Sequence, residues 1–168
     1  MNLETTIIGA IMLAIFIVPY VFFSGSSKRK EKKLLQSLSN IAEQHNCKIT
    51  QHEISGELII GLDETANFVF FFKKINDKGI AQHINLTEIQ NCKVINLNRT
   101  INNKNGNYKV IDKLELSFIP IAKNNSETLL EFYNSDENRQ LTVEFKLIEK
   151  WAKIVNDRLT LQKRRETS

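Results

Sequence analysis

The sequence is poor in the residues that build disulfide frameworks, metal centres and irregular folds. In 168 residues it has two cysteines, two prolines and six glycines. Cys47 and Cys92 show no CxxC spacing, which excludes a disulfide scaffold and the common zinc patterns. This cysteine usage is typical of a reducing compartment, in which both thiols are buried and free. A single disulfide is the alternative for a domain outside the cytoplasm.

Motifs that define a reaction are also absent. The chain contains no GxSxG, GxxxxGK, GxGxxG or HExxH. Its three histidines, His45, His52 and His83, match no zinc spacing with the cysteines. The paired acids Asp63-Glu64 and Asp136-Glu137 occupy expected turn or cap positions, where acidic residues are favoured for local reasons. We therefore expect no cofactor, no metal and no catalytic residue, and predict that the protein is not an enzyme.

The formal net charge of +4 is concentrated at two flanks. One is the basic stretch 28–33, and the other is the C-terminal segment 158–168. The remainder of the chain is net negative. Because a nucleic-acid binder carries its basic stripe on the folded body, this distribution argues against nucleic acid as a partner.

A long apolar run, "TTIIGAIMLAIFIVPYVFF", covers residues 5–23 without a charge. At about 1.5 Å per residue a helix over this run spans roughly 28 Å, close to the hydrocarbon thickness of a bilayer. The run predicts a transmembrane helix, and the basic cluster that follows predicts that its C-terminal side faces the cytoplasm. A cleaved signal peptide is the alternative.

The basic cluster opens a segment that we assign to residues 28–46. Its cations determine topology and offer additional attraction to anionic lipid headgroups. An amphipathic connector helix is predicted to follow, since Leu34, Leu38 and Ile41 recur at helical spacing. The residues predicted to face lipid are Lys28, Arg29, Lys30, Lys32 and Lys33.

The periodicity from Cys47 onward is that of strands separated by turns. Seven strands are predicted, with the sequences "CKITQHEI", "ELIIGLD", "FVFFFKKI", "IAQHINL", "NCKVINLNRTI", "VIDKLELSFIPI" and "TLLEFYN". A broad apolar stripe then predicts a helix over about 136–161, followed by a basic tail at 162–168. The folded domain is thus expected at 47–161.

Seven antiparallel strands and a C-terminal capping helix resemble a pleckstrin-homology-like barrel, with strand features such as "INLTEIQNCKVI" and "LELSFIP". The whole chain, through "NIAEQHNCKIT", "IIGLDETANFVFF" and "EKWAKIVN", also resembles an uncharacterised bacterial family of small single-pass membrane proteins. The expected class is α+β: a transmembrane helix, a connector helix, and a seven-stranded barrel or sandwich with its capping helix. The resemblance implies docking of peptides, proteins or lipid headgroups, and fold alone does not choose among them.

The strand "FVFFFKKI" has large apolar groups on both faces. We expect Phe68, Phe70 and Phe72 to line the barrel, and Val69 and Phe71 to point outward against the connector helix, a second protomer or a larger membrane assembly. The alternative is a strand buried on both sides by the protein's own helices. The candidate partner face consists of Val69, Phe71, Leu34, Leu38 and Ile41.

The function predicted from these features is a membrane-anchored interaction module on the cytoplasmic side of a bacterial inner membrane. Such a module would serve as an accessory or scaffolding subunit of a protein complex. A peripheral reader of anionic lipid headgroups, using the basic flanks and the barrel rim, is the alternative.

Overall fold

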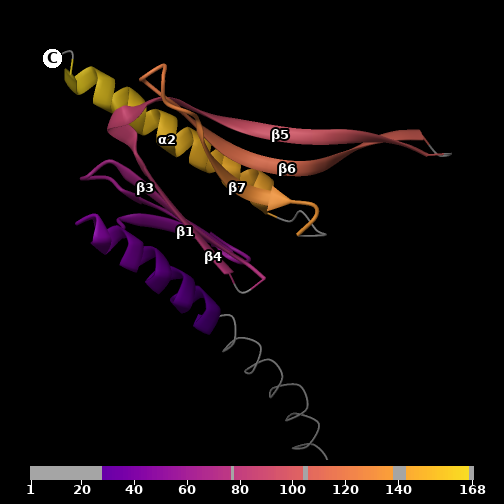
Figure 1. Cartoon of the computed structure of the whole chain (residues 1–168), viewed down its shortest axis with the longest axis horizontal. Helices are drawn as coiled ribbons and strands as arrows, with labels where there is room; N and C mark the ends of the chain where they lie inside the picture. The colour runs from indigo at the N-terminus through magenta and orange to yellow at the C-terminus, as the bar shows by residue number, and fades with distance from the viewer. Residues whose placement is uncertain (1–27, 77, 104–105, 138–142, 167–168) are drawn as a thin grey trace, which may run out of the picture.

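The computed structural model describes residues 28–76, 78–103, 106–137 and 143–166 (Figure 1). The strands are β1 (Gln51–Ser55), β2 (Leu58–Asp63), β3 (Phe68–Ile75), β4 (Lys78–Asn85), β5 (Ile89–Asn103), β6 (Gly106–Pro120) and β7 (Thr128–Asn134). The helices are the N-terminal helix (28–44), the 3-10 helix η1 (Leu86–Glu88) and α2 (Glu144–Glu166).

The strands form two antiparallel sheets. The first sheet has the order β1-β2-β3-β4, and the second has the order β5-β6-β7. Sequence neighbours are therefore sheet neighbours, as expected of strands joined by short turns. Gly56, Asn67 and Asn76 adopt left-handed φ angles of 59°, 57° and 46° in the turns of the first sheet, where glycine and asparagine are the residues that tolerate this region.

The main core lies between the two sheets and α2. Buried side chains reach it from β2, β3, β5, β6, β7 and α2, and its largest member is Trp151 of α2, which is fully buried. Ile148, Trp151, Val155 and Leu159 recur every three or four residues, so they form one stripe of α2 that faces this core. Burial of each such side chain contributes about 1.5–3 kcal/mol.

A second core lies between the N-terminal helix and the outer face of the first sheet. Leu34, Leu38 and Ala42 of the helix pack against Ile59 of β2 and Phe70 of β3. In Figure 1 this helix lies along the first sheet, and α2 lies along the second. The layers are thus, in order, the N-terminal helix, the first sheet, the main core to which α2 contributes, and the second sheet.

Gly61 of β2 sets how closely the N-terminal helix approaches the sheet. A Cβ atom at this position would lie 2.7 Å from Leu38 Cδ2 and 3.2 Å from the backbone oxygen of Gln51. Both distances are shorter than van der Waals contact, so glycine permits the close packing of helix on sheet.

The predicted fold class is wrong in its transmembrane helix. No helix within 28–76, 78–103, 106–137 and 143–166 is long and apolar enough to cross a membrane. The range predicted to span, 5–23, lies outside the described residues. The description as a single-pass membrane protein depended on that helix, so the structure gives it no support.

Three predicted boundaries also need correction. The first strand begins at Gln51 rather than at Cys47, because the Lys48 N–H is bonded to the side-chain carboxylate of Asp63, 2.7 Å away, and not to a backbone carbonyl of β2. The C-terminal helix begins at Glu144, whereas 135–137 form a turn. Its last residue is Glu166, so most of the predicted tail is helical.

The faces of β3 are the reverse of the prediction. Val69 and Phe71 point into the main core and are fully buried, whereas Phe68, Phe70 and Phe72 face the N-terminal helix. The cause is that both faces of β3 are covered: one by the second sheet, the other by the helix. A closed barrel is also not formed, since no backbone ladder joins the two sheets among the described strands.

Candidate functional site

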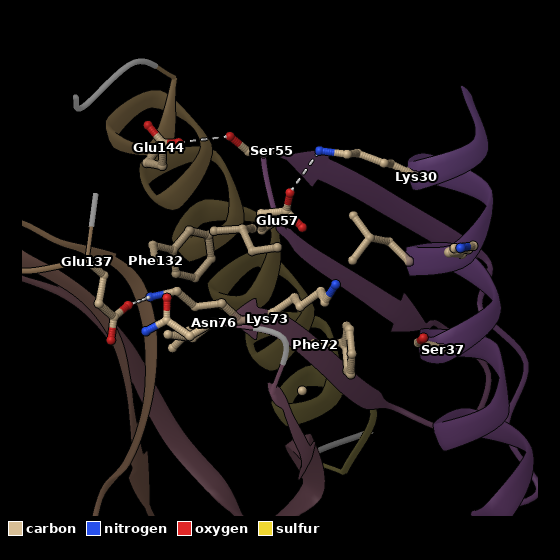
Figure 2. A pocket seen from close by; sticks show the side chains of 17 residues that line it. Lys30, Ser37, Ser55, Glu57, Phe72, Lys73, Asn76, Phe132, Glu137 and Glu144 are labelled. Carbon is tan, nitrogen blue, oxygen red and sulfur yellow. Dashed lines mark hydrogen bonds and ion pairs between the residues drawn. The ribbon is translucent and has the colours of Figure 1, made fainter. Parts of the chain in front are cut away.

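A cleft of about 970 Å³ lies beside the N-terminal helix (Figure 2). One wall is the N-terminal helix, with Lys30, Lys33, Leu34 and Ser37. The opposite side comes from the β1–β2 turn, the β3–β4 hairpin and the segments that flank β7 and α2. This volume lies in the upper part of the range for ligand-binding pockets.

The lining of the cleft is chemically mixed. Its apolar part is formed by Leu34, Leu58, Phe72, Ile75 and Phe132. Its charged part contains the cations Lys30, Lys33, Lys73 and Lys74 and the anions Glu57, Glu137 and Glu144. Such a cleft offers apolar surface for an anchor side chain and charges of both signs for orientation.

Lys73 is the most buried charge that lines the cleft. Its side chain is only 5% exposed, because β3 directs it, like Val69 and Phe71, toward the second sheet. The Lys73 ammonium donates to Glu131 at 2.8 Å and to Glu137 at 3.0 Å. A buried ammonium with two carboxylate acceptors is the arrangement that makes burial of a lysine tolerable.

The Lys73 pair continues into a network on β6 and β7. Glu131 also accepts from Lys113 at 2.8 Å, and Lys113 contacts Glu115 at 2.9 Å. Burial raises the pKa of Glu131, but the hydrogen bonds from Lys113 and Lys73 outweigh it and hold the pKa below its usual value. The hydrogen bonds that Lys113 donates to Glu131 and then to Glu115 raise the pKa of Lys113. Glu131 and Lys113 therefore stay charged near neutral pH.

Two contacts between elements fix the upper part of the cleft. Lys30 of the N-terminal helix lies 3.3 Å from Glu57 in the β1–β2 turn, and Ser55 donates to Glu144 of α2 at 3.2 Å (Figure 2). The Lys30–Glu57 pair is exposed and contributes little stability, but it joins the helix to the first sheet.

The basic residues predicted to face lipid are all exposed on the first turns of the N-terminal helix. They do not form a separate flank, because residues 28–33 are part of the helix. Lys30 and Lys33 line the cleft, whereas Lys28, Arg29 and Lys32 do not.

The predicted partner face is not assembled. Leu34 and Leu38 are buried and Ile41 is half-buried, all against the first sheet, while Val69 and Phe71 lie on the other side of that sheet. Of these five residues only Leu34 contributes to the cleft.

Histidines and cysteines form no metal site among the described residues, where no three His, Cys, Asp or Glu side chains come together. His45 and His83 lie with their ring centroids 3.9 Å apart and their ring planes tilted by 38°. Burial, and then the charge of His45, lower the pKa of His83. Cys47 and Cys92 are free and buried, and burial raises the pKa of Cys92 to about 12, which leaves it an unreactive thiol at neutral pH.

Sequence reasoning missed Lys73, Glu131 and Glu137 as a group. One signal was available: Lys73 has the same strand parity as Val69 and Phe71, so a cation had to lie on an apolar face and needed an acidic partner. The partner could not be found, because it lies on β7, far along the chain.

Comparison of the chain with protein-family models, with curated proteins and with solved structures found no match in any of the three.

Proposed function

We propose that this chain is a non-enzymatic interaction module, an accessory or scaffolding subunit that holds a segment of a partner protein in the cleft beside the N-terminal helix. The observation that carries the proposal is the lining of the cleft, which combines apolar side chains with charges of both signs. A peptide segment supplies matching groups, namely an apolar anchor side chain and flanking polar groups.

The charges of the cleft also indicate the character of the segment. Lys73 and Glu137 neutralise one another, as do Lys30 and Glu57. Lys33 is exposed at the rim and adds positive charge on the side of the N-terminal helix. We expect the bound segment to place an apolar side chain over Phe72 and an acidic residue near Lys33.

Ser37 gives a direct test, since it lines the cleft from the middle of the N-terminal helix. A photoreactive amino acid at this position, in the full chain expressed in cells, should crosslink to one partner protein. The matched control is the same amino acid at Ser39, which is similarly half-buried on the same helix but outside the cleft.

Binding of the purified partner should then discriminate two variants. Ser37→Trp places a large side chain in the cleft and should weaken binding at least about tenfold, whereas Ser39→Trp should not change it. Equal crosslinking at both positions, or equal affinity of both variants for the partner, would show that the cleft is not the docking site.

A second candidate is the binding of anionic lipid headgroups, and the exposed basic turn of the N-terminal helix favours it. Five cations within 28–33 would each add about 1 kcal/mol near an anionic surface. The full chain should then bind phosphatidylglycerol vesicles more tightly than phosphatidylcholine vesicles, with an affinity that falls as salt rises. Equal binding to both vesicles would exclude this function.

A further inference from the structure

β5 is the outer strand of the second sheet, and part of its edge is closed by α2. The Cys92 N–H donates to Asn156 Oδ1 at 3.0 Å, and Asn156 Nδ2 donates to the Cys92 carbonyl at 2.7 Å. One side-chain amide thus makes both bonds that a neighbouring strand would make. Asn156 is itself held by a bond to the Ala152 carbonyl at 2.9 Å.

This contact establishes which backbone groups of β5 face outward. Because Cys92 bonds to α2, its N–H and C=O point away from β6, and every second residue of a regular strand shares that direction. Val94, Asn96, Asn98 and Thr100 therefore direct their backbone groups to the outer edge. The Asn98 side chain lies 3.5 Å from the Asn96 carbonyl, a long contact that fits an outward-facing group.

No strand of the described chain lies along this edge, since the sheet order ends at β5. β5 and β6 also continue past β7 as a two-stranded arm, because β7 pairs only with Lys113–Phe118 of β6 (Figure 1). Two-stranded ribbons are marginally stable without a further strand or a covering layer. An outer edge of this length is a template for another strand.

We propose that the outer edge of β5 pairs with β5 of a second copy of this chain, antiparallel and about a two-fold axis at Leu97. The pairing joins two three-stranded sheets into one continuous sheet. It uses a surface separate from the cleft, and it is independent of the function proposed above.

The two-fold axis at Leu97 follows from the part of the edge that is available. Asn156 closes the edge at Cys92, so the open stretch starts at Val94. Pairing about Leu97 places Val94 opposite Thr100 of the second copy and Asn96 opposite its Asn98. All four residues direct backbone groups outward, so each pair exchanges two hydrogen bonds.

The charged side chains of β5 also favour the register with the two-fold axis at Leu97. With Leu97 at the axis, Arg99 lies opposite Ile95 of the second copy, and Arg99 keeps its own partner Asp112, whose Oδ1 is 3.2 Å from the Arg99 Nε. A two-fold axis at Asn96 would also pair outward-facing backbone groups with one another. It would, however, place Lys93 of one copy opposite Arg99 of the other. Like charges directly opposite in neighbouring strands are destabilising.

The axis also brings an exposed aliphatic side chain into contact with its own copy. Leu97 is 50% exposed on the face of the sheet away from the core, flanked on that face by half-buried Ile95 and Ile101. Facing strands place Leu97 against Leu97, and Ile101 against Lys93, whose charge is paired with Glu127 at 3.5 Å. The contact therefore buries apolar surface without an unpaired charge.

Disulfide crosslinking of the full chain in mild detergent tests the register. Residues in a non-hydrogen-bonded antiparallel pair have Cα atoms about 4.5 Å apart, which a disulfide can bridge. Leu97→Cys should therefore form a crosslinked dimer under mild oxidation. Tyr108→Cys is the matched control, because Tyr108 is also 50% exposed and lies on β6, away from the axis. The native cysteines are buried and should not interfere.

Two further variants measure the affinity of the pairing. Leu97→Lys puts like charges at the axis and should raise the dimer dissociation constant at least about tenfold in sedimentation equilibrium, while Tyr108→Lys should leave it unchanged. The amide exchange of β6 reports that each variant is folded. Crosslinking of Leu97→Cys no faster than that of Tyr108→Cys, or equal dissociation constants for both lysine variants, would overturn the proposal.

Discussion

Replacement of Lys73 by methionine tests one of the most buried charges among the described residues. Methionine keeps the apolar stem but removes the ammonium, so Glu131 and Glu137 lose the donor that lies 2.8 Å and 3.0 Å from them. Removal of one partner of a fully buried ion pair costs about 3–5 kcal/mol. Here the two carboxylates keep 23% and 28% of their side-chain exposure, and Glu131 keeps Lys113. We therefore expect a loss of about 2 kcal/mol in the free energy of unfolding.

Trp151 provides the assay. It is the only tryptophan and is fully buried, so its fluorescence reports loss of the main core during urea unfolding of the full chain. A loss of about 2 kcal/mol corresponds to a midpoint lowered by about 1 M urea at a slope of about 2 kcal/mol per M. Lys48→Met, at an exposed position, is the control and should stay within about 0.5 kcal/mol.

A second substitution distinguishes the loss of the ion pair from the cost of leaving two carboxylates without their donor. Glu137→Gln in the Lys73→Met background removes one of the two carboxylates that lost their donor, so it should restore part of the stability. If Lys73→Met unfolds at the same urea concentration as Lys48→Met, then the Lys73 network does not hold the two sheets together, and the reasoning from its burial is wrong.

Two further predictions concern the N-terminal helix and the histidine pair. Gly61→Ala should cost about 1–3 kcal/mol in urea unfolding, because its Cβ would clash with Leu38, and the cost should shrink in a Leu38→Ala background. His83 has a lowered pKa, so the stability it contributes is present above its usual value near 6.5 and is lost as pH falls below it. The fall in urea midpoint between pH 7.5 and 5.5 should be smaller in His83→Gln, and an identical fall would contradict this assignment.

Strand positions could be predicted from the sequence with good accuracy, but strand orientation could not. The predicted ranges of β3 and β7 coincide with the observed ones, since turn residues mark both ends of each strand. For β3 the alternation was correct and the assignment of faces was wrong. Period-two alternation identifies the core face only when the other face is polar, and Phe70 and Phe71 lie on opposite, equally apolar faces.

The candidate site was harder to predict than the fold. Its walls come from 30–37, 55–58, 72–76, Gly79, Phe132, Glu137 and Glu144, which no local pattern connects. The start of α2 was placed too early because Asp136 and Glu137 resemble the acidic first turn of a helix. Glu137 instead pairs with Lys73. The likeness to a pleckstrin-homology-like fold stays a prediction.

The attachment of the N-terminal helix has a mechanical consequence. Side-chain packing and the exposed Lys30–Glu57 ion pair hold the helix on the first sheet, and no backbone ladder joins residues 28–44 to the described strands. Contacts of this kind yield one after another when the load is applied at one end, so tension at residue 28 would peel the helix away turn by turn. The turns released first carry Lys30, Lys33 and Leu34, which form a wall of the cleft. A pull of this kind would dismantle the cleft while the strands beneath remained paired.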